Sequence, residues 1–286
     1  FFLFLPTEND RMNNPYYTEC PVKDVLSVKS LYTFFRKQIP RDYNFKGESH
    51  DFPEILCVMS GEVGVTADKN VYRLPAGQAI FHRGGEFHSL WSDLGTSPEI
   101  IVFSFAADVF PQSDKHIFTL SAQQLSEISS VFAAAQKAFV LESVRVAAVR
   151  EGKEAEASAV VKRLELFVLS LFTEAPETGF VNANAGRSAE NYARIVSVLE
   201  THIADDLTAE QIAGNLSLPA LNKTMARYAG CGVISYYNEM RLKKAEELLL
   251  NGASVKEAAL SVGFYNQNYF SACYKKHKGV PPSHVR

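Results

Sequence analysis

The first part of the chain alternates short apolar runs with turn-forming residues. Between residues 25 and 110 the apolar runs are Ile55–Met59, Val63–Val65, Ala79–Phe81 and Ile100–Phe105. Gly, Pro, Asn and Asp separate them, at Gly47, Gly61, Asp68–Asn70, Pro75–Gly77, Gly84–Gly85 and Gly95. Short runs at intervals of about 8–12 residues predict the strands of a β-barrel or a β-sandwich.

After Pro111 the pattern changes to a helical one. Segments 121–150 and 154–173 contain few turn formers and have apolar residues at helical spacing, which predicts helices. The apolar stripe of the second segment consists of Val160, Val161, Leu164, Phe167, Val168, Leu171 and Phe172. Such a stripe has to be buried, and the sequence leaves two possibilities open: it covers the barrel, or it pairs with a second copy of the chain.

Residues 174–187 (EAPETGFVNANAGR) have no periodicity and are rich in Gly, Pro, Asn and Ala, which is typical of a linker. From Ser188 onward the pattern is helical until GVPPSH near the end. We therefore predict an α+β multidomain protein. Its parts are a barrel domain over residues 1–120, a helical covering or dimerisation segment over 121–173, a linker over 174–187 and an all-α domain over 188–286.

Two segments of the predicted helical domain resemble each other. One begins at Thr208 with TAEQ and the other at Ser254 with SVKE, and both fit the capping box, in which a hydroxyl and a Gln or Glu three residues later satisfy two backbone amides. Each continues with a small residue where two helices would cross, a break and a second helix. The small residues are Ala213 and Ala259, the breaks are 216–219 and 262–266, and the apolar pairs of the second helices are Leu221 with Met225 and Phe270 with Tyr274.

This arrangement predicts two helix-turn-helix units. The segment Ser235–Leu250 between them predicts one connecting helix about 24 Å long at 1.5 Å per residue. Neighbouring major-groove segments on one face of DNA lie about 34 Å apart, so a rigid helix of that length suits two units that bind DNA side by side.

Charge is unevenly distributed along the chain. The net charge is -3, yet the segment from Lys223 to Arg286 holds ten basic and four acidic side chains. A basic C-terminal segment fits a nucleic-acid partner, and the rest of the chain is acidic. The cysteines (Cys20, Cys57, Cys231 and Cys273) form no CxxC pair, which argues against a zinc finger or a disulfide framework and fits a reducing cytoplasm. No run approaches the roughly 20 apolar residues of a membrane helix, and FFLFLP does not have the pattern of a signal peptide.

Roughly the last 95 residues resemble the AraC/XylS family of transcription regulators. The resemblance rests on Gly230, Tyr236, Arg241 and AEELL at 245–249, and on the second unit with AA at 258–259, VGF at 262–264, QNYFS at 267–271, YKK at 274–276, Gly279, PS at 282–283 and Arg286. Departures from the family pattern are Pro219, Thr224, Met225, Ala226 and Val285. The resemblance implies sequence-specific binding of double-stranded DNA, a homodimer and contact with RNA polymerase, with activation the commoner role.

By this resemblance the outward N-terminal residues of the two second helices face DNA. The predicted DNA-binding residues are Pro219, Ala220, Asn222, Lys223 and Arg227 in the first unit, and Asn266, Gln267, Asn268, Ser271, Ala272, Lys275 and Lys276 in the second. Lys pairs with guanine and Asn or Gln with adenine. Arg227, Lys275, Lys276 and Lys278 lie further along and are expected near phosphates. Tyr265 and Tyr269 are further candidates for the sugar-phosphate backbone, with core packing as the alternative for Tyr269.

The barrel region resembles a cupin. HDFPE at 50–54 followed by Gly61 is similar to part of the first cupin motif, and Gly77 followed by RGGEFH at 83–88 is similar to the second. Glu48 stands in place of the first motif's leading His, and Arg83 in place of a Pro. We predict a small-molecule pocket at the barrel mouth, formed by His50, Glu54, His82, His88 and Trp91, with Arg36 or Tyr43 near its rim.

The predicted function is that of a ligand-responsive, cytoplasmic transcription regulator without enzymatic activity, cofactor or metal, and without a membrane partner. A sugar is one candidate effector, because the chain is rich in Phe and Tyr. The alternative is a metal-dependent cupin enzyme with an accessory DNA-binding domain, since His50, Glu54 and His88 are suitable metal ligands. A third possibility is a constitutive DNA binder whose barrel binds nothing.

Overall fold

The computed structural model describes residues 20–285 except 94, 112–114 and 174–185. The predicted linker therefore lies almost entirely outside the described residues, as do the N-terminal FFLFLP and Arg286. The strands are β1 Ser27–Gln38, β2 Asn44–Glu48, β3 Glu54–Ser60, β4 Glu62–Ala67, β5 Asn70–Pro75, β6 Gln78–His82, β7 His88–Ser92, β8 Glu99–Val109, β9 Ile117–Thr119, β10 Phe139–Glu142 and β11 Arg145–Val149.

The strands form two antiparallel sheets that face each other. One has seven strands in the order β10-β11-β1-β8-β3-β6-β9, and the other has four in the order β2-β7-β4-β5. Side chains alternate between the two faces of a strand. Leu56 and Val58 of β3 point to the apolar core between the sheets, whereas Ile55 and Cys57 point to the outer face of the large sheet. This alternation confirms the predicted barrel-like domain.

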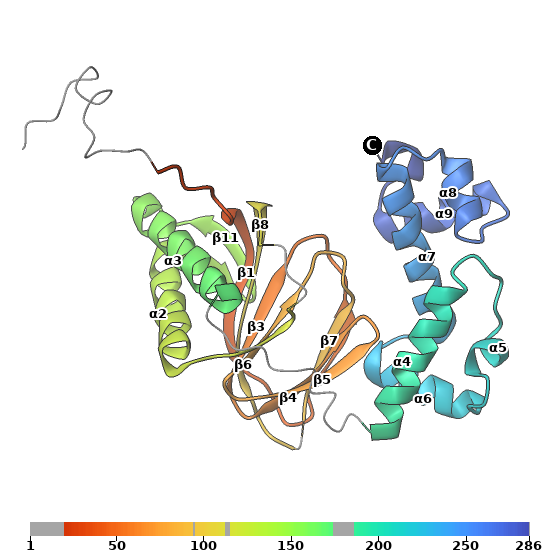
Figure 1. Cartoon of the computed structure of the whole chain (residues 1–286), viewed down its shortest axis with the longest axis horizontal. Coiled ribbons are helices and arrows are strands. Elements are labelled where there is room, and N and C mark those ends of the chain that lie inside the picture. The colour runs from red at the N-terminus through yellow and green to blue at the C-terminus, as the bar shows by residue number, and fades with distance from the viewer. Residues whose placement is uncertain (1–19, 94, 112–114, 174–185, 286) are drawn as a thin grey trace, which may run out of the picture.

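Two helices cover the outer face of the large sheet (Figure 1): α2 Ala122–Ala138 and α3 Glu154–Thr173. The apolar stripe of α3 packs against α2 and the sheet within the same chain, and Val160, Leu164, Phe167, Val168 and Leu171 are all buried there. Of the two possibilities left open by the sequence, the stripe covers the barrel. It is therefore not available as the surface of a dimer.

The prediction of a helix through residue 150 is wrong for residues 139–149. Helix α2 ends at Ala138, and the chain continues as the hairpin of β10 and β11, whose turn includes Ser143 at φ 57°. β-Branched residues favour strands, and this hairpin contains Val140, Val146 and Val149. The hairpin extends the large sheet because β11 pairs with β1, a contact between distant segments that periodicity does not reveal.

The C-terminal domain is helical, as predicted. Its elements are α4 Gly186–Thr201, α5 Ala209–Ala213, α6 Leu218–Tyr228, α7 Val233–Leu250, α8 Val255–Ser261, α9 Gln267–Lys278 and the short 3-10 helix η1 Pro282–His284. Helices α5 and α6 form one helix-turn-helix unit, α8 and α9 form the other, and α7 runs between the two (Figure 1). Among the described residues, no helix is both long and apolar enough to cross a membrane.

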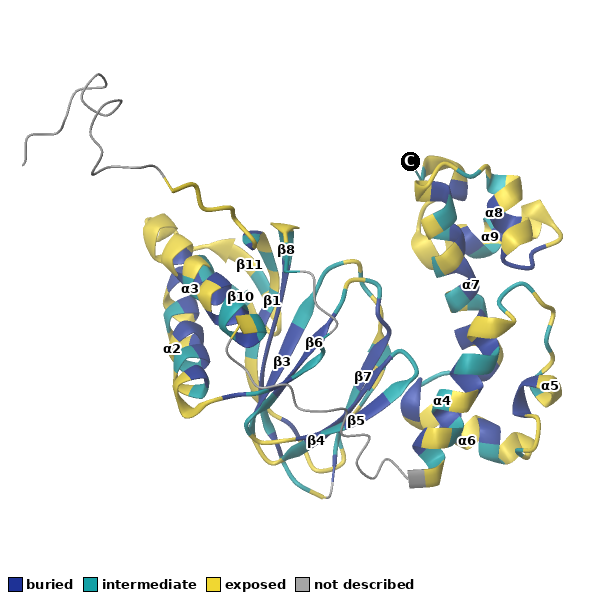
Figure 2. Ribbon diagram, viewed as in Figure 1, coloured by how far each residue is buried: buried dark blue, intermediate teal, exposed yellow. Residues whose placement is uncertain are grey.

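The local signals of the repeat are confirmed. Both capping boxes are present, with Gln211 returning a hydrogen bond to Thr208 and Glu257 returning one to Ser254. The small crossing residues and the apolar pairs of the second helices are buried (Figure 2): Ala213, Ala259, Leu221, Met225, Phe270 and Tyr274. Because each unit buries these few apolar residues on one face, the opposite face of α6 and of α9 is left to solvent.

A buried arginine of α7 connects the two units. The guanidinium of Arg241 donates hydrogen bonds to the backbone carbonyls of Ile203 and Asp205, which follow α4. It also lies over the ring of Tyr237, at 4.1 Å from the centroid, and 5.8 Å from the ring of Phe264 in the second unit. Hydrogen bonds to a charged donor are stronger than neutral ones, so Arg241 fixes α7 relative to both units.

Candidate DNA-binding helices and the polar end of the barrel

Helix α6 exposes most of the residues predicted to contact DNA. Ser217 caps its N-terminus by accepting a hydrogen bond from the amide of Ala220. Pro219, Asn222 and Lys223 are exposed and Ala220 is half-buried. Arg227 is exposed near the end of the helix, 5.2 Å from the ring centroid of Tyr228. The N-terminal part of α6 therefore presents one cation and one amide to solvent.

Helix α9 exposes its predicted residues in a similar way. Gln267, Asn268, Ala272, Lys275 and Lys276 are exposed, and Ser271 is half-buried. Tyr265 and Tyr269 are 77% and 58% exposed, which excludes core packing for Tyr269. Both phenol rings thus lie on the surface beside the N-terminus of α9.

Two residues of this second unit have partners that the sequence did not predict. The side-chain oxygen of Asn266 caps α9 by accepting hydrogen bonds from the amides of Asn268 and Tyr269. The ammonium of Lys278 lies 2.5 Å from a carboxylate oxygen of Glu246 on α7. Asn266 therefore fixes the start of the helix, and Lys278 is directed toward α7.

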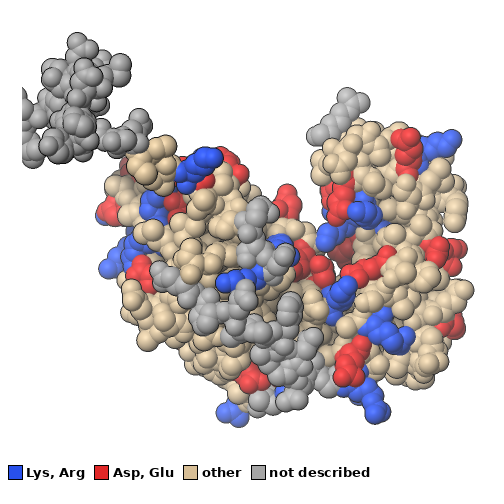
Figure 3. Space-filling view, in the orientation of Figure 1, with Lys and Arg blue, Asp and Glu red and all other residues tan. Residues whose placement is uncertain are grey.

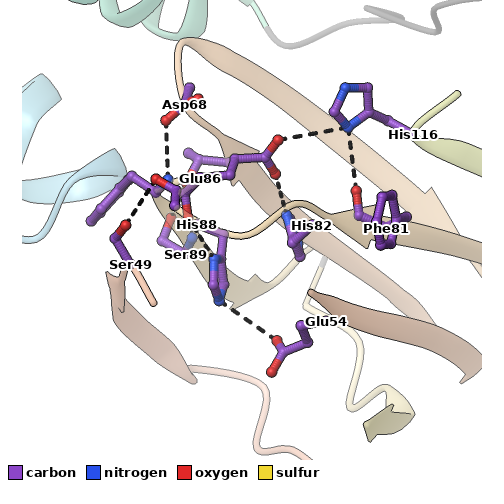
Figure 4. A network of polar contacts seen from close by, with 12 residues as sticks. Ser49, Glu54, Asp68, Phe81, His82, Glu86, His88, Ser89 and His116 are labelled. Carbon is purple, nitrogen blue, oxygen red and sulfur yellow. Dashed lines mark hydrogen bonds and ion pairs between the residues drawn. The ribbon is translucent and has the colours of Figure 1, made fainter. Parts of the chain in front are cut away.

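Four of the five residues predicted for the barrel pocket lie together at one end of the barrel (Figure 4). Glu54 begins β3, His82 ends β6 and His88 begins β7, and strand alternation points all three inward. The ring of His88 stacks on that of His82 at 4.5 Å and meets that of His50 edge-on at 4.9 Å. The Glu54 carboxylate lies 3.6 Å from Nε2 of His88 and 3.9 Å from Nε2 of His50.

A second group of polar residues holds the stacked histidines in place. Nδ1 of His82 lies 2.6 Å from a carboxylate oxygen of Glu86, and the other oxygen of Glu86 lies 3.6 Å from Nδ1 of His116. His116 also contacts the backbone carbonyl of Phe81 at 3.2 Å. Figure 4 shows this network running from His116 through Glu86 to His82. The orientation of His82, and of the ring stacked on it, is therefore fixed.

Burial displaces the protonation equilibria of this end of the barrel toward the neutral forms. Burial, and secondly the charge of Glu48, raises the pKa of Glu54 to about 8. Burial is also the main cause that lowers the pKa of His82 and of His88 to about 3 and raises that of Glu86 to about 7. The histidines are thus neutral imidazoles at pH 7, each with one nitrogen available as an acceptor.

Trp91 does not belong to this pocket, and its prediction as a pocket residue is wrong. It lies three residues from His88 on β7, so the two side chains point to opposite faces of the strand. The indole meets the ring of Tyr228 at 5.5 Å and packs against Gly64, where an added Cβ would lie 2.0 Å from it. Trp91 therefore packs against the helical domain.

The two predicted rim residues have partners of their own. Arg36 forms a two-pronged ion pair with Glu99, with both N–O distances 2.9 Å. Tyr43 packs against the core between the sheets and lies under the ammonium of Lys37. Neither residue has a printed contact with the histidine cluster.

The outer face of β7 forms the contact between the two domains. Ser89 donates a hydrogen bond to the carbonyl of Tyr228 at 2.9 Å, and Phe87 meets the ring of Tyr236 edge-on at 5.3 Å. Beside this contact lies a cavity of about 530 Å³, lined by Asp68 and Phe87 from the barrel and by Tyr236 and Lys243 of α7, among others. Figure 3 shows the hollow between the barrel and the helical domain, with both signs of charge around it.

Sequence reasoning missed several residues that shape these sites. Glu48 was noted only as a replacement for a histidine, yet its carboxylate lies within 4.8 Å of the ligand nitrogens of His50 and His88. Its alternation with His50 along an extended segment was the available signal. Ser89 and Tyr228 had no signal in the sequence, because their contact joins two separate domains.

A barrel followed by two helix-turn-helix units defines a transcription regulator with a ligand-binding domain, and known proteins support this class. The profile described as "AraC-like ligand binding domain" matches residues 31–155, and the one described as "Helix-turn-helix domain" matches residues 211–286. The HTH-type transcriptional activator RhaS of Salmonella schwarzengrund (strain CVM19633) is 25% identical over 256 residues, which cover 85% of this chain and 87% of RhaS. The chain belongs to the AraC family of transcription regulators.

Two further similarities concern parts of the chain or its general shape. The HTH-type transcriptional regulator GbdR of Pseudomonas aeruginosa (strain UCBPP-PA14) is 29% identical over 104 residues, which cover 35% of this chain and 28% of GbdR. The crystal structure of ToxT from Vibrio cholerae O395 is 15% identical, covers 88% of this chain and 95% of that one, and has a TM-score of 0.35.

Proposed function

We propose that this regulator reads a two-part DNA site through the N-terminal halves of α6 and α9. The observation that carries the proposal is the exposure of Lys223 on one helix and Asn268 on the other, while the opposite faces of both helices are buried. Lys donates to guanine and Asn pairs with adenine in the major groove. Lys275 and Lys276 further along α9 supply contacts to phosphates, which position the protein without reading sequence.

The connecting helix suits this geometry. Helix α7 has 18 residues and is therefore about 27 Å long. Its position is fixed by Arg241, which contacts both units. A rigid spacer of this length lets the two recognition helices enter neighbouring segments of the major groove, about 34 Å apart.

A small-molecule effector bound at the polar end of the barrel would control the DNA-binding domain. His88 faces that end, while its neighbours Phe87 and Ser89 contact the helical domain. A ligand that moves His88 therefore moves residues that hold α6 and α7. Such a ligand shifts the population between domain arrangements only if it binds one of them more tightly. A sugar remains the first class of effector to test.

The remaining partners follow from the family and are proposals for this chain. They are a second copy of the chain, in a homodimer, and RNA polymerase at an activated promoter in the cytoplasm. Because the stripe of α3 is buried within the chain, the dimer would have to use another surface. The rival hypothesis of a metal-dependent enzyme rests on the donor groups at the barrel end, and it would require turnover of a substrate besides metal binding.

Selection of DNA from a random pool by the full chain tests the proposal. We expect an enriched site with two conserved parts separated by about one helical turn. Lys223→Ala should relax one part and Asn268→Ala the other, since each removes one base-reading side chain. Lys29→Ala, at an exposed residue of the barrel that pairs with Asp108, serves as the control. Failure to enrich any site, or equal effects of all three variants, would contradict the proposal.

A further inference from the structure

The polar end of the barrel brings together four side chains that can only accept hydrogen bonds or bind a cation. Glu48 at the end of β2, His50 after it and His88 on β7 each offer one ligand atom within 4.8 Å of the others. The Glu54 carboxylate faces both imidazoles, with oxygens 3.9 Å and 3.6 Å from their Nε2 atoms. Both distances exceed that of a hydrogen bond.

The hydrogen bonds of the two histidines determine which nitrogen is free. Nδ1 of His50 lies 2.8 Å from the carbonyl of Phe52, and Nδ1 of His88 lies 3.1 Å from the carbonyl of Glu86. Because a carbonyl only accepts, each Nδ1 carries the proton and each Nε2 presents a lone pair. Both Nε2 atoms are buried and have no hydrogen-bond partner. Leaving such groups without a partner is costly, so a ligand that accepts their lone pairs would be favoured.

We propose that Glu48, His50, Glu54 and His88 form a binding site for a divalent transition-metal ion. Metal–nitrogen distances of about 2.0–2.1 Å place neighbouring ligand atoms of a tetrahedral site about 3.4 Å apart. The observed separations of 3.6 and 3.9 Å come within a few tenths of an ångström of that value. Two imidazoles with carboxylates suit zinc, iron, cobalt or nickel better than magnesium or calcium.

The surrounding residues hold this site in position. His82 stacks on His88 at 4.5 Å and is itself fixed by Glu86, while Phe52 stacks on His50 at 3.9 Å. Glu48 is exposed, so the site opens to solvent on that side and an ion can enter there. The expectation of a metal-free barrel rested on Glu48 in place of a histidine, but a carboxylate at that position is also a metal ligand.

The proposal concerns the same end of the barrel as the proposed effector, but its test needs no DNA, so failure of one does not decide the other. The full-length protein is first freed of metal with a chelator and then titrated with cobalt(II), whose visible absorption reports its coordination. We expect one cobalt ion per chain, displaced by zinc. A titration without a 1:1 endpoint, or one showing only hydrated cobalt, would overturn the proposal.

Matched variants locate the ion. His50→Gln and Glu48→Gln should each weaken cobalt binding about tenfold or more. His277→Gln is the control, because Nδ1 of His277 also contacts a carbonyl, that of Cys273, while the side chain lies on the surface of α9. Circular dichroism verifies folding, and if His50→Gln is unfolded, the exposed Glu48 decides. Unchanged affinity in the folded variants, or an equal loss in His277→Gln, would show a different site and overturn the assignment.

Discussion

Ser89 of β7 donates a hydrogen bond from its hydroxyl to the backbone carbonyl of Tyr228, the last residue of α6. The carbonyls at the end of a helix lack partners within the helix, so this bond satisfies one of them from another domain. Because the Ser89 hydroxyl donates to Tyr228, the hydroxyl of Thr66, 2.7 Å away, donates to Ser89. A continuous chain of hydrogen bonds thus joins the small sheet to the first recognition helix.

Phe87, Ser89 and Trp91 continue this contact along one face of the chain, and His88 points to the other face. One strand therefore carries both the barrel cluster and the contact with the helical domain. Any change in the position of His88 is transmitted over a single peptide unit to Ser89. This makes β7 the structural connection between the proposed ligand site and the proposed DNA-binding helix.

Gly230→Ala should disturb this interdomain contact. Gly230 has φ 65°, and an added Cβ would lie 2.3 Å from the Cβ of Lys46 on β2. Gly252 has φ 91° with nothing within 4 Å, so Gly252→Ala has the same left-handed backbone penalty, about 1–2 kcal/mol, without the collision. Trp91 is the only tryptophan and is 8% exposed, so its fluorescence reports the contact. We expect a red shift in Gly230→Ala and none in Gly252→Ala; identical spectra would contradict this account.

Arg241→Lys should destabilise the helical domain although it keeps the charge. A lysine cannot donate to the carbonyls of Ile203 and Asp205 with the fixed fork of the guanidinium. We expect a loss of about 2 kcal/mol in the free energy of unfolding, in the range of a hydrogen bond to a charged group. Urea unfolding followed by helical circular dichroism measures it. Lys244→Ala, which removes an exposed ion pair with Glu247, should change stability by less than about 0.5 kcal/mol.

How much the sequence revealed depends on the range of the interaction. The capping boxes at Thr208 and Ser254 span three residues, and both were predicted correctly. The inward direction of Glu54 and His88 follows from strand alternation once the strands are known. The same alternation points Trp91 outward, but without the strand boundaries its spacing from His88 had no meaning.

Contacts between distant segments could not be predicted. The hairpin at 139–149 forms because β11 pairs with β1, more than one hundred positions earlier in the chain. The role of Arg241 depends on carbonyls 36 and 38 positions away. The capping role of Asn266 was in reach, since Asn is a favoured N-cap, but the resemblance to a family of DNA-binding proteins suggested base contacts instead.

The two capping boxes should differ in their response to acid. Hydrogen bonds from Ser254 lower the pKa of Glu257, whereas the equivalent residue of the first unit, Gln211, does not ionise. A lowered pKa in the folded state means that the contribution to stability is present above the ordinary glutamate pKa of about 4.3 and is lost as the pH falls through the folded value. We expect α8 to lose amide protection below about pH 4 in the wild type.

Hydrogen exchange of the α8 amides at pH 3 to 7, compared between the wild type and Glu257→Gln, measures this effect. The glutamine still accepts from the backbone of Ser254, so the variant should show less acid dependence in α8 once intrinsic exchange rates are corrected for. The α5 amides serve as the internal reference, because their box contains Gln211. Parallel acid dependence of α8 in the two proteins would exclude a role for Glu257.

Lys223→Ala and Lys276→Ala should affect DNA binding in different ways. Lys223 lies near the exposed start of α6, where a recognition helix reads bases, and its loss should lower affinity for the preferred site by about 1–3 kcal/mol and change sequence preference. Lys276 lies near the end of α9, and its loss should weaken matched and scrambled duplexes equally. Lys276→Ala should also reduce the slope of log affinity against log salt by about 0.9, the value for one phosphate contact. Gel-shift titrations of both variants on both duplexes at several salt concentrations distinguish the two roles. If the variants lose affinity in the same proportion on both duplexes, Lys223 contacts phosphate and α6 does not read sequence through it.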